Sequence, residues 1–400
     1  MARFLPFRAL RPAPTLAPEV ASVPYDVVNR DEARRLVEGK PRSYLHITRP
    51  EIDLGEGVDP HSDGVYRQGR EALERFMSEG VLRRDEQPRL YVYELRIDNH
   101  RQCGFVGLAS IDDYRNGIVR KHELTRPEKE DDRVRHMELL KAQSGTVFLA
   151  HRDSASLNEI AQSVVDSTPD VDFVAEDGVA HRVWTVSDSK TVDAIVRGFD
   201  EAGPIYIADG HHRSAAAARV SQPMSDGEPG FLSVSFPASE VRILAYNRYV
   251  EDLNGLSSEQ FLSRIGEDFD VQPGRAASTR PRQFEMRLGT QWHTLQLRGA
   301  APSSRIEGLD VALLQNLILK PVLDIGDPRT SDRIAFIGGV RGYEALESRV
   351  ASGGVAFALH PTSMEDLLAI ADQGGVMPPK STWFEPKLRD GLFTHLIETF

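Results

Sequence analysis

The chain has 400 residues and a formal net charge of −12 at pH 7, with 40% hydrophobic and 27% charged residues. This length exceeds the usual size of one hydrophobic core and predicts two or three domains, while the negative charge argues against a general nucleic-acid surface. One cysteine, Cys103, excludes an internal disulfide framework. The first residues carry arginines and prolines without an apolar stretch, and no later run approaches a membrane span, so we expect a cytoplasmic protein with no membrane partner.

The first hundred residues alternate between short helices, loops and a hairpin. Their patterning predicts helices over 31–39 and 65–80, a loop over 51–64, and paired strands over 90–97 and 104–111. The polar residues Asp98-Asn99-His100 form the expected hairpin turn. Cys103 lies at the second strand, so we expect a buried structural thiol rather than a nucleophile.

A polar segment precedes a predicted helix near residue 127. Pro127 favours a first helical turn, and Val134, Met137 and Leu140 supply an apolar stripe. We interpret the charged residues 128–135 as a solvated face. The loop before the helix combines a carboxylate, an imidazole, a hydroxyl and two cations, and these residues are Lys121, His122, Glu123, Thr125 and Arg126. A polar connector and a reactive loop both explain this composition.

The most specific local pattern is a β-prone run, 204–208, that leads directly into an alanine-rich helix. Asp209, Gly210, two histidines and Arg213 stand between them or in the first helical turn. A helix start directs free N–H groups and a positive dipole end at the turn. Asp209 can hold a hard cation such as Mg²⁺, and Arg213 offers a fork of donors to phosphate. The pattern therefore indicates a phosphate and metal site.

The C-terminal region mixes helices, strands and loops. The expected elements are a loop over 270–283, a buried helix over 309–319, a tight turn at 338–342, amphipathic helices over 341–350 and 363–372, and a buried strand over 353–359. The proline-rich segment 377–387 is rigid and extended. Its residues Lys380, Ser381 and Thr382 contact phosphate or substrate, or the segment is a strap whose aromatic residues pack on the core; both interpretations stay open.

Other signatures are absent from the sequence. Gly39-Lys40 is followed by proline, so there is no Walker A loop, and no cysteine or histidine pair has structural zinc spacing. His211 and His212 are adjacent, so on a helix their side chains diverge by roughly 100°. They do not suit one metal together, but either can join His122 or His136 in space.

Five motifs, in this order, resemble one family over nearly the whole chain. They are Phe7-Arg8-Ala9-Leu10-Arg11-Pro12, Val23-Pro24-Tyr25-Asp26-Val27-Val28, the segment from Lys121 to Arg133, Ala208-Asp209-Gly210-His211-His212-Arg213, and Met377-Pro378-Pro379-Lys380-Ser381-Thr382-Trp383-Phe384. The chain is identified by them as a member of domain-of-unknown-function family 1015, the SerK-like proteins. Residues 105–235 are also similar to the archaeal free-serine kinases, which share a ParB/sulfiredoxin-type domain.

The resemblance implies an α+β fold with a ParB/sulfiredoxin-like kinase core over 105–235, between α+β regions at 1–104 and 236–400. It also implies a Mg²⁺-dependent kinase that phosphorylates a small hydroxylated metabolite, most of all free L-serine, with ATP or ADP as donor. The alternatives are a metal-dependent phosphoesterase or hydrolase, and a non-catalytic ParB-like nucleotide switch.

Residue roles follow from the same resemblance. Glu123 would be the general base, Asp209 would lie by the phosphates and Mg²⁺, and His212 would complete the catalytic group. The implied phosphate-binding residues are Thr125, Arg126, Gly210, His211, His212 and Arg213. Further contacts with substrate or phosphate are expected from Lys121, His122, Lys380, Ser381 and Thr382. The mechanism requires folding to bring the Glu123 loop beside the Asp209 turn.

Overall fold

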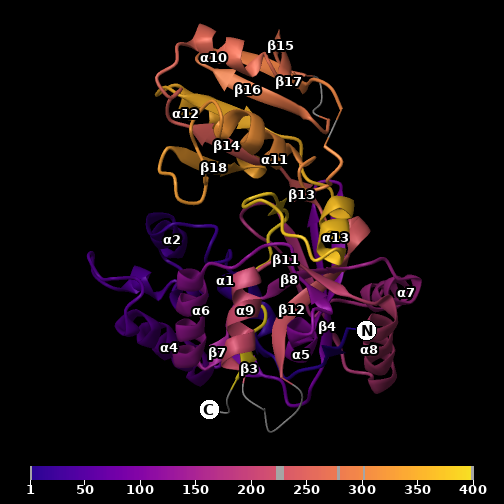
Figure 1. Cartoon of the computed structure of the whole chain (residues 1–400). Coiled ribbons are helices and arrows are strands. Elements are labelled where there is room, and N and C mark those ends of the chain that lie inside the picture. Colours follow the sequence, from indigo (N-terminus) through magenta and orange to yellow (C-terminus); the bar gives the residue numbers. More distant parts are fainter. Residues whose placement is uncertain (1, 222–228, 277–279, 301, 398–400) are drawn as a thin grey trace. The chain divides into compact units, whose positions relative to one another are not determined.

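The computed structural model describes residues 2–221, 229–276, 280–300 and 302–397 (Figure 1). The chain divides into two compact units, of which the first comprises residues 1–241 and 386–400 and the second comprises 242–385. The chain therefore leaves the first unit, builds the second, and returns to the first at its C-terminal end.

The first unit is built on a mixed sheet. Among the described residues, nine strands form this sheet. The order is β6 (Val119–Arg120), β11 (Ile205–Asp209), β8 (Val147–His151), β12 (Gly230–Pro237), β5 (His100–Ser110), β4 (Leu90–Ile97), β10 (Ala180–Val186) and β9 (Val171–Val174), with β1 (Phe4–Leu5) also on β5. Strand β11 runs parallel to β6, and β12 runs parallel to β8. The central strands are buried along most of their length, as sheets covered on both faces require.

Helices of this unit pack on the sheet and on one another. They are α1 (Ala17–Val20), α2 (Arg30–Val37), α3 (Leu45–Thr48), α4 (Asp63–Ser78), α5 (Ile111–Arg115), α6 (Pro127–Leu140), α7 (Ala155–Val165), α8 (Ser189–Ala202) and α9 (His211–Val220). Strands of the sheet contact α1, α5, α7, α8 and α9. Helix α6 packs against both α9 and α4, and α7 packs against α8 (Figure 1). Two short ladders complete the unit, β2 (Leu10–Pro12) with β3 (Leu82–Arg84) and β7 (Ala142–Gln143) with β21 (His395–Leu396). The second ladder attaches the returning C-terminal segment.

The second unit contains an antiparallel sheet. Within its described part, six strands follow the order β15 (Phe269–Pro273), β17 (Gln291–Leu297), β16 (Gln283–Leu288), β19 (Val355–Ala358), β14 (Tyr246–Val250) and β18 (Ile334–Gly338). Its helices are α10 (Ser258–Ile265), α11 (Asp310–Leu314), α12 (Gly342–Val350) and α13 (Met364–Asp372). A separate ladder pairs β13 (Ile243–Leu244) with β20 (Trp383–Phe384).

Most local predictions agree with these elements. The helices predicted over 31–39 and 65–80 are α2 and α4, and the predicted hairpin is the pair β4–β5, in which Ile97 pairs with His100. The buried helix predicted over 309–319 is α11 followed by a π-helical turn, Gln315–Leu319. The mixed α+β class is confirmed. No helix within the described residues combines the length and the apolar character needed to cross a membrane.

One sequence prediction differs from the structure. The loop predicted over 270–283 is wrong for 270–273, which belong to β15, and for Gln283, which begins β16. Pro273 is tolerated there because β15 is an edge strand, where a missing N–H need not break a ladder. The division into functional regions at 104/105 and 235/236 stays a prediction.

Candidate active site

The turn between β11 and α9 places Asp209, Gly210 and Arg213 together. The ladder between β11 and β8 shifts register between Ile207 and Asp209, and Gly210 then adopts φ +99° before the helix begins. A Cβ at Gly210 would lie 3.1 Å from Arg213 Nε. Glycine therefore serves two needs here, because it accepts the left-handed backbone and leaves room for the guanidinium.

Asp209 is paired with a cation from the C-terminal segment. Lys387 Nζ lies 3.2 Å from Asp209 Oδ2, and the two side chains are 14% and 34% exposed, respectively. Burial would raise the pKa of Asp209, but the charges of Lys387 and Arg213 hold that pKa well below its usual range. The carboxylate is therefore ionised at neutral pH. Sequence reasoning did not assign Lys387 to the site, because no local pattern links residue 387 to residue 209.

Arg213 is a buried guanidinium surrounded by carboxylates. It is 5% exposed and donates to the Thr146 carbonyl. Burial would lower its pKa, but the nearby carboxylates raise that pKa above the ordinary value; they are Asp26, Asp209 and Asp390. Asp390 is itself buried, and burial raises its pKa to about 7 although the Arg213 charge opposes the shift. Asp26 and Asp390 are thus further site residues that the sequence did not single out.

The Glu123 loop meets the first turn of α9. Ligand atoms of His122, Glu123 and His211 all lie within 4.8 Å of one another. The rings of His122 and His211 are perpendicular, with centroids 4.5 Å apart. The backbone N–H of His122 donates to His211 Nε2 at 3.5 Å. The strands explain the meeting, because β6 and β11 are parallel neighbours and their carboxyl ends share one edge of the sheet. Folding therefore brings Glu123 to the turn after Asp209, as the proposed mechanism requires.

Both buried histidines are neutral at pH 7. Burial lowers the pKa of His122 to about 4. Burial is also the main reason that the pKa of His211 lies well below its usual value, and the neighbouring His122 lowers this pKa further. The pair offers neutral imidazoles rather than cations. Positive charge at this turn comes instead from Arg213 and Lys387.

The remaining predicted residues of the loop lie outside this buried group. The Arg126 N–H donates to His212 Nε2 at 3.0 Å, which fastens the start of α6 to α9. Thr125 donates to Glu130 at 2.9 Å within the first turn of α6. Lys121 is exposed and lies 4.5 Å from the centre of the Tyr114 ring. Their phosphate-binding roles stay predictions.

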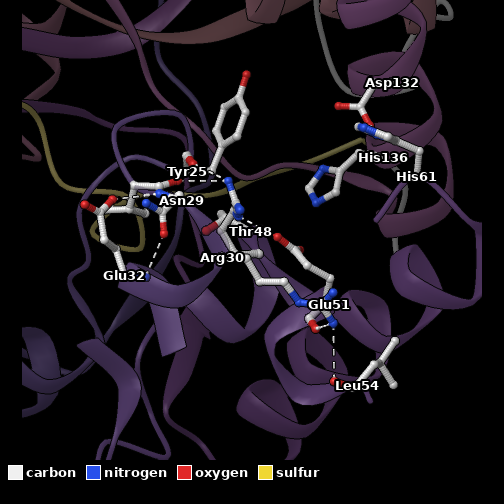
Figure 2. Close-up of polar contacts among 12 residues, drawn as sticks. Tyr25, Asn29, Arg30, Glu32, Thr48, Glu51, Leu54, His61, Asp132 and His136 are labelled. Carbon is white, nitrogen blue, oxygen red and sulfur yellow. Dashed lines mark hydrogen bonds and ion pairs between the residues drawn. The ribbon is translucent and has the colours of Figure 1, made fainter. Parts of the chain in front are cut away.

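The face of α6 predicted to be solvated is partly buried. Asp132 and Arg133 have side chains only 14% and 12% exposed and form an ion pair at 2.5 Å. His61 contacts Asp132 at 2.6 Å (Figure 2). Arg133 lies 4.1 Å from the centre of the Tyr25 ring. The solvated-face prediction is therefore wrong for Asp132 and Arg133, because α6 packs against the segment around Tyr25 and against α4.

His136, on the same helix α6, was a further candidate for a shared metal site with His211 or His212. Its Nε2 lies 3.3 Å from the Ile47 carbonyl, and it does not belong to the cluster of His122, Glu123 and His211. The neighbouring backbone is held by Arg30, which donates to the Glu51 carbonyl at 3.0 Å, and by a capping box at the start of α2. His136 is thus a buried histidine that contacts the Ile47 carbonyl and the Tyr66 ring.

Lys380, Ser381 and Thr382 belong to the second compact unit. Ser381 donates to the Pro378 carbonyl at 2.6 Å, and Arg248 donates to the Lys380 carbonyl at 2.9 Å. Trp383 covers Gly338, where a Cβ would approach the indole to 2.7 Å. Such contacts are expected if the segment 377–387 is a strap whose aromatic residues pack on the core. Phosphate contacts by Lys380, Ser381 and Thr382 stay a prediction.

Solved structures with similarity to the chain share little sequence with it. A conserved hypothetical protein from Pyrococcus furiosus has 14% identity and a TM-score of 0.38, with 74% of this chain and 97% of that chain covered. A free serine kinase in complex with AMP has 14% identity and a TM-score of 0.39, covering 74% and 93%. SbnI with a C-terminal truncation, from Staphylococcus aureus, has 10% identity and a TM-score of 0.42, covering 73% and 87%.

No curated protein matches the chain. A family described as "Protein of unknown function (DUF1015)" matches residues 4–312, which is more than half of the sequence. This range contains the Glu123 loop, the Asp209 turn and the whole of α9. The chain therefore belongs to the DUF1015 family.

Proposed function

We propose that the chain is a phosphotransferase that moves a phosphoryl group from ATP or ADP to the hydroxyl of a small metabolite such as free L-serine. One observation carries the proposal: Glu123 lies within 4.8 Å of His211, at the turn where Asp209, Arg213 and Lys387 gather. A carboxylate and a positively charged helix start therefore lie at one place. Motif resemblance to the free-serine kinases supports the same activity.

The donor phosphates would bind at the start of α9. A helix N-terminus presents unpaired N–H groups and a positive dipole end to an anion. Arg213 is held by the Thr146 carbonyl, and Lys387 is held by Asp209, so both cations are positioned before a nucleotide arrives. Pre-positioned charge is the main contribution that proteins make to phosphoryl transfer.

Glu123 would serve the acceptor. In the transfer, the acceptor oxygen forms a bond to phosphorus, the bond between phosphorus and the nucleotide's bridging oxygen breaks, and the hydroxyl proton passes to the carboxylate. His122 and His211 lie beside Glu123 as neutral imidazoles, so they add no positive charge next to this carboxylate.

A Mg²⁺ ion fits this turn through Asp209 and the donor's phosphate oxygens. Mg²⁺ prefers oxygen ligands and is often held by one or two carboxylates together with substrate phosphates. Asp209 is ionised, and one of its oxygens already contacts Lys387 at 3.2 Å. Bound there, the ion would neutralise phosphate charge.

The direct test incubates the full chain with Mg²⁺, ATP or ADP, and a panel of hydroxylated metabolites that includes L-serine, with mass spectrometry of the products. We expect a phosphorylated acceptor from the wild type, and about 10²- to 10⁴-fold slower turnover from Glu123→Gln, which keeps the shape but loses the proton acceptor. Nucleotide binding by that variant should persist. Glu138→Gln, on the exposed side of α6, is the matched control.

Each alternative has its own outcome in this test. Release of phosphate from a phosphomonoester, without transfer to any acceptor, would indicate a phosphoesterase. Nucleotide binding without any turnover would indicate a switch. Turnover that is unchanged in Glu123→Gln would remove Glu123 from the mechanism.

A further inference from the structure

We propose that His122, Glu123 and His211 form a binding site for a divalent transition-metal ion, separate from the Mg²⁺ expected at Asp209. The three ligand atoms lie within 4.8 Å of one another, although the residues come from two segments. His122 and Glu123 follow β6, whereas His211 is the first residue of the ten-residue helix α9. The shared edge of two parallel strands thus assembles two imidazoles and one carboxylate.

The geometry suits a single ion after small side-chain movements. Ligands about 2.1 Å from a common zinc ion, at tetrahedral angles, lie about 3.4 Å apart. Contraction from the observed limit of 4.8 Å requires shifts on the order of 1 Å, shared among three side chains. The perpendicular ring arrangement, with centroids 4.5 Å apart, lets a nitrogen of each ring approach the same point without stacking.

A buried nitrogen with no partner is the second observation. His122 is 2% exposed, and its Nδ1 has no hydrogen-bond partner among the described residues. A buried polar atom left in this state keeps its full desolvation penalty, so native proteins rarely contain one without a ligand, an ion or water. His211 is 4% exposed, and its Nε2 accepts a long hydrogen bond, at 3.5 Å, from the backbone N–H of His122. A metal ion would give the buried Nδ1 of His122 a partner.

The donor set selects the class of metal. Two neutral imidazoles and one carboxylate match the ligands of zinc and of first-row ions such as Mn²⁺, Co²⁺ or Fe²⁺, whereas Mg²⁺ and Ca²⁺ prefer oxygen ligands. Three protein ligands also leave a position open, as in catalytic rather than structural sites. The hard-ion site at Asp209 and this site therefore differ in chemistry as well as in residues.

The site can be tested without any turnover. Because metal binding is measured directly, the proposal does not rest on the proposed phosphoryl transfer, and either can fail alone. If both hold, the ion would lower the pKa of an acceptor hydroxyl, and Glu123 would be both a ligand of the ion and the acceptor of the proton.

The experiment titrates the chelator-treated full chain with ZnCl₂, CoCl₂, MnCl₂ and MgCl₂, using calorimetry and elemental analysis after dialysis. We expect one equivalent of Zn²⁺ or Co²⁺, with the visible absorption of nitrogen- and oxygen-bound Co²⁺. Affinity should fall at least 100-fold in His122→Gln and His211→Gln, and clearly in Glu123→Gln. His212→Gln, which changes the adjacent histidine outside the cluster, is the matched control, and it should keep the wild-type affinity.

Two outcomes would overturn the proposal. The first is a wild type that binds no Zn²⁺, Co²⁺ or Mn²⁺ stoichiometrically, or binds them equally in both His122→Gln and His211→Gln. The second is loss of Zn²⁺ binding in Asp209→Asn, which would place the ion at the aspartate. If a histidine variant does not fold, Glu123→Gln decides the matter, because this half-buried carboxylate can lose its charge at nearly constant volume.

Discussion

Replacing Lys387 with methionine should destabilise the first unit by leaving Asp209 without its cation. The two charges lie 3.2 Å apart. Coulomb's law gives about 1 kcal/mol at this distance in bulk water and about 5 kcal/mol at an effective dielectric constant near 20. Because Asp209 is 34% exposed, solvent screening and desolvation reduce the net value. We expect Lys387→Met to cost about 1–3 kcal/mol at pH 7.

The same pair predicts a direction of pH dependence. The pKa of Asp209 is lower in the folded protein than in the unfolded chain, so the pair stabilises the fold above the ordinary carboxylate range, near pH 4. This stabilisation is lost as pH falls through the lower folded pKa. The difference in stability between the wild type and Lys387→Met should therefore shrink as pH falls below about 4.

Hydrogen exchange read by mass spectrometry can follow peptides of β11 and α9, so the second unit does not enter the measurement. A double-mutant cycle with Asp209→Asn gives the coupling energy. The control cycle uses Lys40 and Glu176, an ion pair with both partners well exposed, whose coupling should stay below about 1 kcal/mol. Equal coupling in the two cycles would refute the electrostatic reasoning for Lys387.

Three further predictions concern the turn and the thiol. Gly210→Ala should lower the free energy of unfolding by about 1–2 kcal/mol more than Gly117→Ala, because both positions have positive φ but only the first would crowd Arg213. Equal losses of stability in urea unfolding would contradict this. Arg213→Ala should weaken nucleotide binding about tenfold or more in calorimetry, through loss of a charge-assisted contact, and unchanged affinity would place the phosphates elsewhere. Burial raises the pKa of Cys103 to about 12, so a thiol reagent should label it only as the protein unfolds, and rapid labelling of the native chain would show it to be accessible.

Local chemistry explains which parts of the fold could be predicted. The run before Asp209 is apolar and β-prone, Gly210 permits the left-handed turn, and alanines follow, so strand, turn and helix are all encoded within a few residues. Pro127 marks the start of α6 for the same local reason. The neighbours of each strand could not be predicted in this way, because they are chosen by long-range pairing: β12 pairs with both β5 and β8.

Local chemistry selected Asp209 and Arg213 as candidates, because an acid before a helix start and a guanidinium in its first turn suit a metal and phosphate, whereas the family resemblance selected Glu123 from its polar loop. Only the tertiary structure brought Lys387 to Asp209, because an ion pair between residues so distant in sequence leaves no periodic or compositional trace. Likewise, only the parallel pairing of β6 with β11 placed His122 against His211. The sequence thus determined which chemical groups are present and which local turns present them. Long-range strand pairing decided which of those groups meet, because burial of the sheet's apolar residues acts across the whole chain.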